Sequence, residues 1–205
     1  MMQLPTQPTA IVLLHLLVLG TSAKICPSVN VRNSVDHLDQ LRGCSVVEGY
    51  VQILLMERTN ESSFEPWSFP ELREITQYLL FYRVKGLRRI GQLFPNLVRV
   101  GGAKLFIDYS LVVHEMYNLQ EIGLGNLTEI SRGSVIVTKN PSLCYVNTVN
   151  WDRIAKWDPM KNYVSKNKDA KACPSCPTNC PEDLCWSQSE CQIQPKSHCH
   201  PLCLG

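Results

Sequence analysis

One motif recurs in this chain at a nearly fixed spacing. The run FPELREI at 69–75 returns as FPNLVRV at 94–100, 25 positions later, and Leu119 and Ile122 repeat its step from leucine to isoleucine. Runs rich in β-branched and aromatic residues accompany these copies at 78–84, 105–109 and 135–139 and predict strands. A period in the twenties with one strand per repeat is typical of a solenoid, whose turns share a core that no single repeat could bury.

Strand alternation predicts which side chains face the core. We expect strands at 30–32, 53–57, 79–82, 105–108 and 135–138. Neighbouring side chains of a strand point to opposite faces, so parity sorts them into two columns. The inward column contains Val31, Leu54, Met56, Leu79, Phe81, Phe106, Val135 and Val137, with Asp108 as its polar member. The outward column contains Asn30, Arg32, Leu55, Glu57, Leu80, Tyr82, Leu105, Ile107, Ile136 and Thr138.

The outward column is unusually apolar for a surface. Its members Arg32, Glu57, Tyr82, Ile107 and Thr138 should lie in one row, because steps of 25, 25, 25 and 31 positions separate them. The apolar members would form a patch of several hundred square ångströms: Leu55, Leu80, Tyr82, Leu105, Ile107 and Ile136. An exposed apolar patch of that size marks a binding site, unless a loop or second domain of the same chain covers it.

The cysteines and the N-terminal segment predict export. Ten cysteines among 205 residues, seven of them between Cys173 and Cys203, indicate an oxidising compartment. The apolar run AIVLLHLLVL at 10–19, followed by small residues, predicts a signal peptide over 1–23 with cleavage after Ala23. No later segment is apolar for long enough to cross a bilayer, and the net charge of +2 gives no electrostatic case for nucleic acid. We therefore expect a secreted chain.

Two segments have the spacing of helices that close the ends of a solenoid. Between Cys26 and Cys44, apolar residues recur three apart, and a bond between these cysteines would clamp a short helix over one end. A second capping helix is expected within 146–163, with Trp151, Ile154 and Trp157 three apart and a stop at Asp158 and Pro159. From Cys173 onward cysteine and proline dominate, so disulfides replace a core there.

Two sequons are candidate glycosylation sites. Asn60 begins the sequon at 60–62 in a loop between turns, and Asn126 begins the sequon at 126–128 at a repeat corner.

Several runs resemble the start of the extracellular region of the insulin receptor family. They are CSVVEGYVQILLM (44–56), FPELREITQYLLFYRVKGL (69–87), LFPNLVRVGGAKLF (93–106), NPSLCYVNTVNW (140–151) and CHPLCLG (199–205). The resemblance implies a mainly β fold, a right-handed β-helix of the receptor L-domain type over 24–172. A truncated furin-like cysteine-rich region over 173–205 would follow. A full-length parent would resemble a receptor tyrosine kinase, but these residues contain no kinase domain.

The resemblance also implies a function and a site. In that family the outer strand face of the first L domain binds insulin-like peptide hormones. Carried over by position, the site contains Arg32, Asn33, Leu54, Leu55, Leu80, Tyr82, Leu105, Phe106, Tyr109, Val112, Glu115 and Lys139. The family pattern differs at three outward positions, where Asn30 replaces an acidic residue, Glu57 an aromatic residue and Ile136 an arginine. These departures concern affinity and hormone preference rather than fold.

The resemblance further implies the cysteine pairing. The implied pairs are Cys26 with Cys44, Cys144 with Cys173, Cys176 with Cys185, and Cys180 with Cys191, while Trp186 would plug the end of the core. Cys199 and Cys203 match family cysteines whose partners lie beyond Gly205. They would be unpaired, unless they bond to each other or to a second chain.

Other chemistries fit the residues less well. Cys173 and Cys176 have the spacing of a redox site but lie at a domain junction, and Cys191, His198, Cys199, His200 and Cys203 could be zinc ligands in a chain less rich in disulfides. We find no phosphate loop and no activated nucleophile, so we expect no enzyme, no metal and no cofactor.

Three functions stay open. The first is the hormone-binding portion of an insulin-like receptor, as a fragment, a truncated splice product or a secreted decoy. The second is an L-domain interaction module that does not bind hormone, and the third is a disulfide-rich inhibitor. In the family a helical segment from far downstream completes the high-affinity site. We therefore expect weak binding or none by the chain alone, recovered when such a helical peptide is added, while a decoy would sequester hormone or pair with an intact receptor.

Overall fold

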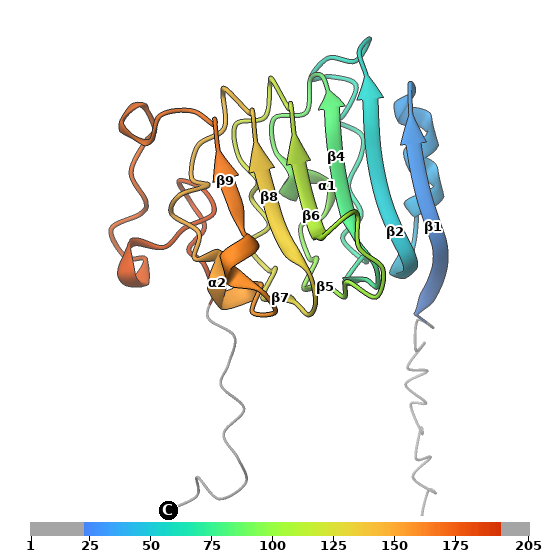
Figure 1. The fold of residues 1–205 in the computed structure, drawn as a ribbon. Coiled ribbons are helices and arrows are strands. Elements are labelled where there is room, and N and C mark those ends of the chain that lie inside the picture. The colour runs from blue at the N-terminus through green and yellow to red at the C-terminus, as the bar shows by residue number, and fades with distance from the viewer. Residues whose placement is uncertain (1–22, 194–205) are drawn as a thin grey trace, which may run out of the picture.

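The computed structural model describes residues 23–193 (Figure 1). Its strands are β1 (Lys24–Arg32), β2 (Cys44–Met56), β3 (Glu74–Ile75), β4 (Leu79–Val84), β5 (Arg99–Val100), β6 (Tyr109–His114), β7 (Glu129–Ile130), β8 (Ser134–Thr138) and β9 (Tyr163–Ser165). The helices are α1 (Ile90–Leu93) and α2 (Trp151–Ile154), with 3₁₀ segments at Val35–Leu41, Pro159–Lys161, Ala170–Ala172 and Pro181–Asp183. The described chain is therefore mainly β, as predicted.

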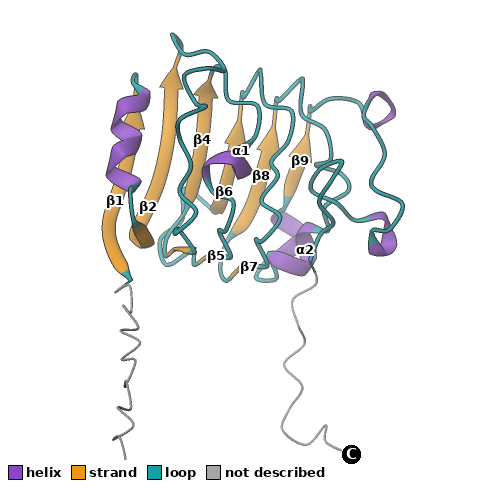
Figure 2. Cartoon of the chain, turned by 180° about the vertical axis from the view of Figure 1, so that it is seen from behind, coloured by secondary structure: helices purple, strands orange, loops and turns teal. Residues whose placement is uncertain are grey.

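The named strands of the described residues all pair in parallel. In the order β1, β2, β4, β6, β8 and β9 they form the broad sheet seen face on in Figure 1, which we call the front ladder. The first half of β2 also pairs with β3, which is followed by β5 and β7. The sheet is open, and the chain returns behind it through loops and α1 (Figure 2). Each return carries the chain to the next parallel strand.

Corresponding positions of the front ladder bury one continuous row of side chains. This inward row contains Val31, Ile53, Phe81, Val113, Val137 and Val164. The first five are buried in a single hydrophobic core, and Val164 packs against it. Branched and aromatic side chains pack well on a pleated surface, and here each member of the row covers its neighbours. The repeated motif contributes to the same core, because Leu72, Ile75, Leu97 and Val100 are fully buried.

The front-ladder strands end at a shared bend with left-handed backbone. The bend residues, with φ between 49° and 65°, are Asn33, Leu55, Arg83, Glu115, Lys139 and Lys166. A left-handed conformation costs a non-glycine residue about 1 to 3 kcal/mol, so the surrounding pairing must hold it in place. The bend also breaks the alternation of the strand. Leu54 before it lies on the outer face and Met56 after it lies in the core, although both have the same parity.

This bend explains why Leu54 does not face the core. Parity places Leu54 inward, and that prediction is wrong, because Leu54 packs in a cluster on the outer face of the sheet. The row predicted to contain Glu57 is wrong for the same reason. The residue aligned with Arg32 and Tyr82 is Leu54, and Glu57 lies beyond the end of β2 in an ion pair with Lys85.

The strand predicted at 105–108 is also wrong. The chain there forms a loop, and the strand that pairs with β4 is β6. Phe106 is therefore 39% exposed instead of inward, Asp108 is exposed, and His114 instead of Ile107 stands in the row with Tyr82 and Thr138. The predicted row is correct at Arg32, Tyr82 and Thr138.

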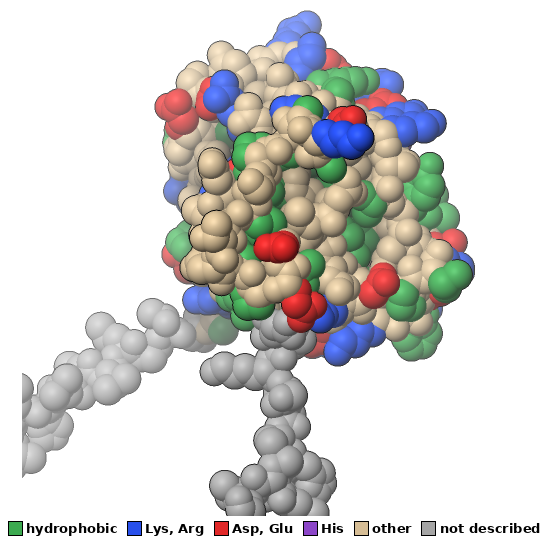
Figure 3. Space-filling model, turned by 90° about the vertical axis from the view of Figure 1, so that its left-hand side faces the viewer, with side chains coloured by type: hydrophobic (Ala, Val, Ile, Leu, Met, Phe, Trp, Pro, Cys, Tyr) green, Lys and Arg blue, Asp and Glu red, His purple; other side chains and the backbone are tan. Residues whose placement is uncertain are grey.

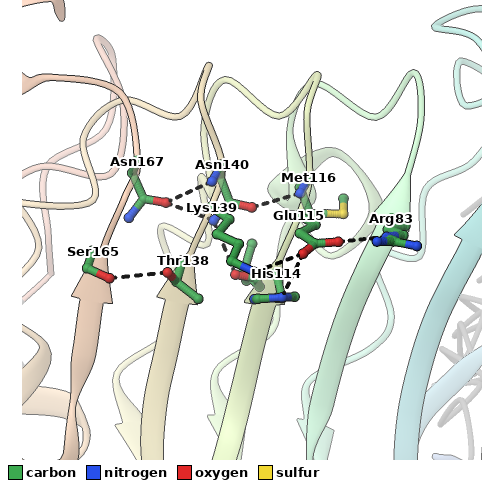
Figure 4. Close-up of polar contacts among 10 residues, drawn as sticks. Arg83, His114, Glu115, Met116, Thr138, Lys139, Asn140, Ser165 and Asn167 are labelled. Atoms are coloured by element: carbon green, nitrogen blue, oxygen red, sulfur yellow. Dashed lines mark hydrogen bonds and ion pairs between the residues drawn. The ribbon is translucent and has the colours of Figure 1, made fainter.

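Beyond the bend, the side chains of Asn140 and Asn167 are joined by a hydrogen bond and also bond to the backbone (Figure 4). The buried Asn140 accepts the backbone N–H of Met116 at 2.9 Å and donates to the carbonyl of Val113 at 3.2 Å. Its side chain also donates to Oδ1 of Asn167 at 2.8 Å, and Asn167 donates to the carbonyl of Val137 at 2.9 Å. These bonds satisfy buried backbone groups at the corner of two successive repeats.

Both ends of the front ladder are covered. At β1 the 3₁₀ segment Val35–Leu41 buries Leu38 and Leu41, and a disulfide joins Cys26 to Cys44. At the other end the predicted helix over 146–163 is wrong except for α2. The helix stops because Ala155 leaves helical geometry and bridges to Ile130. Trp157 is consequently 66% exposed.

One disulfide ties the C-terminal part to this end of the sheet, and two more lie within that part. The bonds are Cys144 with Cys173, Cys176 with Cys185, and Cys180 with Cys191, the pairs that the resemblance implies. Trp186 is buried and packs edge-on against Trp151 with ring centroids 5.4 Å apart. Figure 3 views the molecule from the side of β9 and shows hydrophobic groups between charged ones on its surface. The expected signal peptide, apart from Ala23, and both Cys199 and Cys203 lie outside the described residues.

Candidate ligand-binding groove

A second apolar cluster lies on the outer face of the front ladder, separated from the core by the sheet. Leu54, Tyr78, Leu80 and Val112 are buried in it, and around them pack Tyr50, Leu55, Tyr82, Tyr109 and Ile136. Leu80, Val112 and Ile136 are direct neighbours on three strands. The outer face thus has an apolar floor built from consecutive repeats.

The loop that precedes β6 rises over this floor. Phe106 and Tyr109 exchange two backbone hydrogen bonds, of 2.9 and 3.0 Å, which close a tight turn. The ring of Phe106 packs on Tyr78, with centroids 5.9 Å apart, and Tyr78 stacks on Tyr50 at 5.0 Å. Burial and the neighbouring Tyr50 raise the pKa of Tyr78. Ile107, at the tip of the turn, is 77% exposed. The turn therefore forms a wall beside the floor.

Floor and wall enclose an open hollow of about 400 Å³, which we call the groove. Its lining residues are Arg32, Gln52, Leu54, Leu80, Tyr82, Phe106, Ile107, Tyr109, Val112, His114 and Ile136. A concave, mainly apolar site with a few polar groups is the usual form of a binding site. Its size suits one or two side chains of a larger partner.

An ion cluster lies at the bend beside the groove (Figure 4). Glu115 accepts a hydrogen bond from Nε of Arg83 at 2.6 Å and another from Nζ of Lys139 at 3.1 Å. The bonds from Arg83 and Lys139 lower the pKa of Glu115 from 4.5 to about 2. The guanidinium of Arg83 also lies over the ring of Tyr82, 5.1 Å from its centroid. The cluster joins three strands and fixes the orientation of Tyr82, which lines the groove.

The structure places most of the predicted site residues around the groove. Arg32, Leu54, Leu80, Tyr82, Phe106, Tyr109 and Val112 line it. Leu55 packs on the apolar cluster, Glu115 and Lys139 form the ion cluster, and Asn33 is exposed at the bend after Arg32. Leu105 lies apart from the lining, at the base of the loop against Gly133.

The predicted site set omits four lining residues. Ile107 and Ile136 belong to the predicted outward patch, but Gln52 and His114 belong to neither set. Gln52 has the wrong parity for an outward residue because the bend lies between it and Glu57. His114 follows Leu111, Val112 and Val113, and this β-forming run is the signal that would have located β6.

Neither a metal centre nor a membrane span is found in residues 23–193. No three His, Cys, Asp or Glu side chains of these residues gather as metal ligands would. The helices within the same range are all too short or too polar to cross a bilayer.

Comparison with known proteins defines the class. The family model described as Receptor L domain matches residues 43–155, which include β2 to β8 and most of the groove. The fold and this match make the chain a receptor L-domain protein.

Curated relatives narrow this class. The chain is 44% identical to an insulin-like peptide receptor of Branchiostoma lanceolatum and 44% identical to a putative molluscan insulin-related peptide receptor of Lymnaea stagnalis, over 88% of the chain in both cases. It is 42% identical to the insulin-like growth factor 1 receptor of Xenopus laevis over 96% of the chain. The chain belongs to the insulin receptor family. It spans 14%, 12% and 17% of the length of these three relatives.

Proposed function

We propose that this chain is an extracellular ligand-binding portion of an insulin-like receptor and that its groove binds an insulin-like peptide hormone. The observation that carries the proposal is the apolar groove on the outer face of the sheet. Leu54, Leu80 and Val112 form its buried floor, yet the hollow is open. A partner side chain that fills the hollow would remove from water its own apolar surface and the exposed apolar lining at Phe106 and Ile107. The names of two relatives, an insulin-like peptide receptor and a putative insulin-related peptide receptor, support the same ligand class.

The proposed site keeps the residues that the resemblance supplies. It comprises Arg32, Asn33, Leu54, Leu55, Leu80, Tyr82, Leu105, Phe106, Tyr109, Val112, Glu115 and Lys139. In this proposal the apolar members anchor the hormone, and the ion cluster of Glu115 holds Arg83 against the ring of Tyr82 in the groove lining.

We propose an organisation to match this function. A signal peptide over 1–23 directs export, a receptor L domain over 24–172 forms a right-handed β-helix, and a furin-like cysteine-rich region occupies 173–205. The parallel front ladder supports the second assignment, and the disulfide pairs support the third. In this arrangement the chain acts by binding, as part of a receptor or as a secreted decoy, and not as an enzyme.

Of the two proposed glycosylation sites, Asn60 is the more accessible. Its Oδ1 accepts bonds from Ser62 and Ser63, and the residue is exposed. The amide nitrogen of Asn126 instead donates to the carbonyl of Pro95 at 2.8 Å. A glycan at Asn126 would have to break this bond.

A mutation in the groove floor tests hormone binding. Leu80→Ala should weaken the affinity for a purified insulin-like peptide by about 1 to 3 kcal/mol, because a buried anchor is truncated. Calorimetric titration, with and without a helical peptide from the downstream part of a related receptor, measures this effect. Ile107→Ser, at an exposed lining position, should also weaken binding, whereas Val98→Ala, outside the groove lining, should not.

Unchanged affinity in folded Leu80→Ala and Ile107→Ser would place the binding site elsewhere. If the unsubstituted chain binds no peptide even with the helical segment, the alternative holds, an L-domain interaction module without a hormone. Ile136 favours this alternative, because an isoleucine lines the groove where the family resemblance implies an arginine.

A further inference from the structure

The segment between α2 and β9 carries large apolar side chains in contact with water (Figure 1). In this segment, residues 155–162, which we call the α2–β9 loop, Trp157 is 66% exposed and Met160 is 94% exposed. Tyr163, which begins β9, is 47% exposed. Three of the nine large exposed hydrophobic residues of the described chain therefore lie within seven positions, a cluster of the kind that marks an interaction site.

Hydrogen bonds hold the α2–β9 loop in one conformation. The hydroxyl of Ser134 donates to the carbonyl of Asp158 at 3.0 Å. Oδ1 of Asn162 accepts the backbone N–H of Val135 at 3.0 Å, and the amide nitrogen of Asn162 donates to Asp152 at 2.9 Å. The exposed apolar groups are thus fixed in position before a partner arrives, and binding need not order the backbone.

Positive charge surrounds these apolar side chains. The guanidinium of Arg132 lies over the ring of Trp157, 5.9 Å from its centroid. Residues 156–168 contain four lysines and one aspartate, a net charge of +3, whereas the whole chain carries +2. The aspartate, Asp158, lies 3.5 Å from the ammonium of Lys161, and Lys156 is exposed. A partner of this surface should therefore be negatively charged.

Shape and charge together favour a lipid surface over a protein. A side chain that is 94% exposed has almost no neighbours beside it, so Met160 stands at a protruding tip, and neither it nor Trp157 lines the groove. Tryptophan and tyrosine prefer the boundary between lipid and water, where lysine stems lie along apolar surface and their ammonium groups reach the headgroups. A second copy of the chain would instead bring two positive surfaces together.

We propose that the α2–β9 loop attaches the protein to anionic membrane surfaces. Trp157 and Met160 insert among the lipid headgroups, while Lys156, Lys161 and Arg132 contact the lipid phosphates. The chain lies on the bilayer and does not span it, because the inserted part is one short loop. This inference goes beyond hormone binding and does not depend on it, since the inserted residues lie outside the groove lining.

Vesicle flotation with the whole purified chain tests the proposal. Vesicles of phosphatidylcholine with about one third phosphatidylserine should bind at least about tenfold more tightly than phosphatidylcholine alone, since each basic residue near an anionic surface contributes about fivefold. Trp157→Ser combined with Met160→Ser should weaken this binding at least about tenfold, because two inserted apolar side chains are lost. Ile25→Ser is the matched control. It removes a side chain that is 64% exposed on β1, at the other end of the ladder, and should bind as the unsubstituted chain does.

A second pair of variants tests the charge. Lys156→Gln combined with Lys161→Gln should weaken binding to the anionic vesicles by about 5- to 25-fold and leave binding to neutral vesicles unchanged. Arg58→Gln removes an exposed cation just beyond β2 and should change neither.

Tryptophan fluorescence gives a readout that is specific to the loop. The other three tryptophans, Trp67, Trp151 and Trp186, are at most 9% exposed. Anionic vesicles should therefore shift the emission to the blue through Trp157. Trp157→Phe keeps an apolar ring, so it should bind within about twofold of the unsubstituted chain yet show no shift.

Three results would overturn the proposal. The first is equal affinity for neutral and anionic vesicles, and the second is undiminished binding by folded Trp157→Ser with Met160→Ser. The third comes from sedimentation without lipid. If the unsubstituted chain forms a dimer and the double serine variant a monomer, the α2–β9 loop is an interface between copies and not a lipid contact.

Discussion

At the scale of single residues, Glu115 is the central anion of the outer face, because it pairs with both Arg83 and Lys139. Its left-handed backbone directs the carboxylate along the bend, where residues from both neighbouring strands reach it. Arg83 and Lys139 together provide two cations for one anion, so the carboxylate is held ionised. If Glu115 lost its charge, Arg83 and Lys139 would lose the carboxylate that pairs with both of them.

Glu115→Gln should therefore change how stability depends on pH. The folded-state pKa is about 2, below the ordinary 4.5, so the stabilisation by the carboxylate is complete above about 4.5 and is lost as pH falls toward about 2. Chemical denaturation across this range should show a steeper acid loss for the unsubstituted chain than for Glu115→Gln. Glu57→Gln, which removes an exposed partner of Lys85, is the matched control and should change little. Parallel pH profiles for the unsubstituted chain and Glu115→Gln would contradict the assigned pKa.

At the scale of elements, the sequence predicts where strands occur better than which way their side chains point. The strands predicted at 53–57, 79–82 and 135–138 overlap β2, β4 and β8, because branched residues there serve both propensity and burial. The predicted alternation is wrong at Leu54 because the next residue, Leu55, has a left-handed backbone. A leucine gives no sequence signal for that conformation. The prediction for Phe106 is wrong for another reason. An aromatic residue in a loop has the same local sequence signal as one in a strand, and only the strand pairing tells the two apart.

The same elements explain how much of the groove could be anticipated. Leu80 and Ile136 have outward parity in correctly located strands, so the apolar floor is visible in the sequence. The register of β2, β4 and β6 is what brings three other residues to the outer face: Gln52, Tyr78 and His114. That register depends on the loop that precedes β6. Long-range pairing of this kind leaves no local pattern.

The stacked asparagines at the bend should contribute strongly to stability. Asn140→Ala would leave the N–H of Met116 and the carbonyl of Val113 without their side-chain partner in a buried place, at a cost of about 2 to 4 kcal/mol. Asn118→Ala is the control, because its one side-chain bond, to the N–H of Gly86, is exposed and should be worth less than about 1 kcal/mol. Urea denaturation of the two variants measures the difference. Equal losses of unfolding free energy in the two variants would mean that the buried hydrogen bonds of Asn140 add no specific stabilisation.

At the scale of the whole molecule, the ends of the sheet set its stability. An open parallel sheet exposes its interior at the first and last strand, and the chain covers both places with disulfide-tied segments. The cysteine count and the apolar spacing at Val35, Leu38 and Leu41 made the first cover predictable. The second was predictable only in part: Trp151 and Ile154 lie in α2 as expected, but α2 stops where Ala155 bridges to Ile130, a contact between residues 25 positions apart.

Removing the first bridge should loosen the N-terminal cover. Cys26 and Cys44 close a loop with a sequence separation of 18, and replacing both by serine should cost about 3 kcal/mol of unfolding free energy. The matched double variant Cys176→Ser with Cys185→Ser opens a shorter loop, with a separation of 9, outside the sheet, so it should lower the stability of the sheet less. Hydrogen exchange at β1 and at β8 separates the two effects. Equal protection of β1 in both variants would contradict a role for Cys26 and Cys44 in holding that end.

The groove draws its lining from five strands and one loop, each contributing only one to three residues. Even the richest stretch, residues 106–114, supplies only five of the eleven lining residues, and the other six come from four other strands. Synthetic peptides copied from the sequence would therefore fail to compete for a ligand, and antibodies raised against such peptides would miss the assembled surface. Blocking reagents would have to be selected against the intact, oxidised protein.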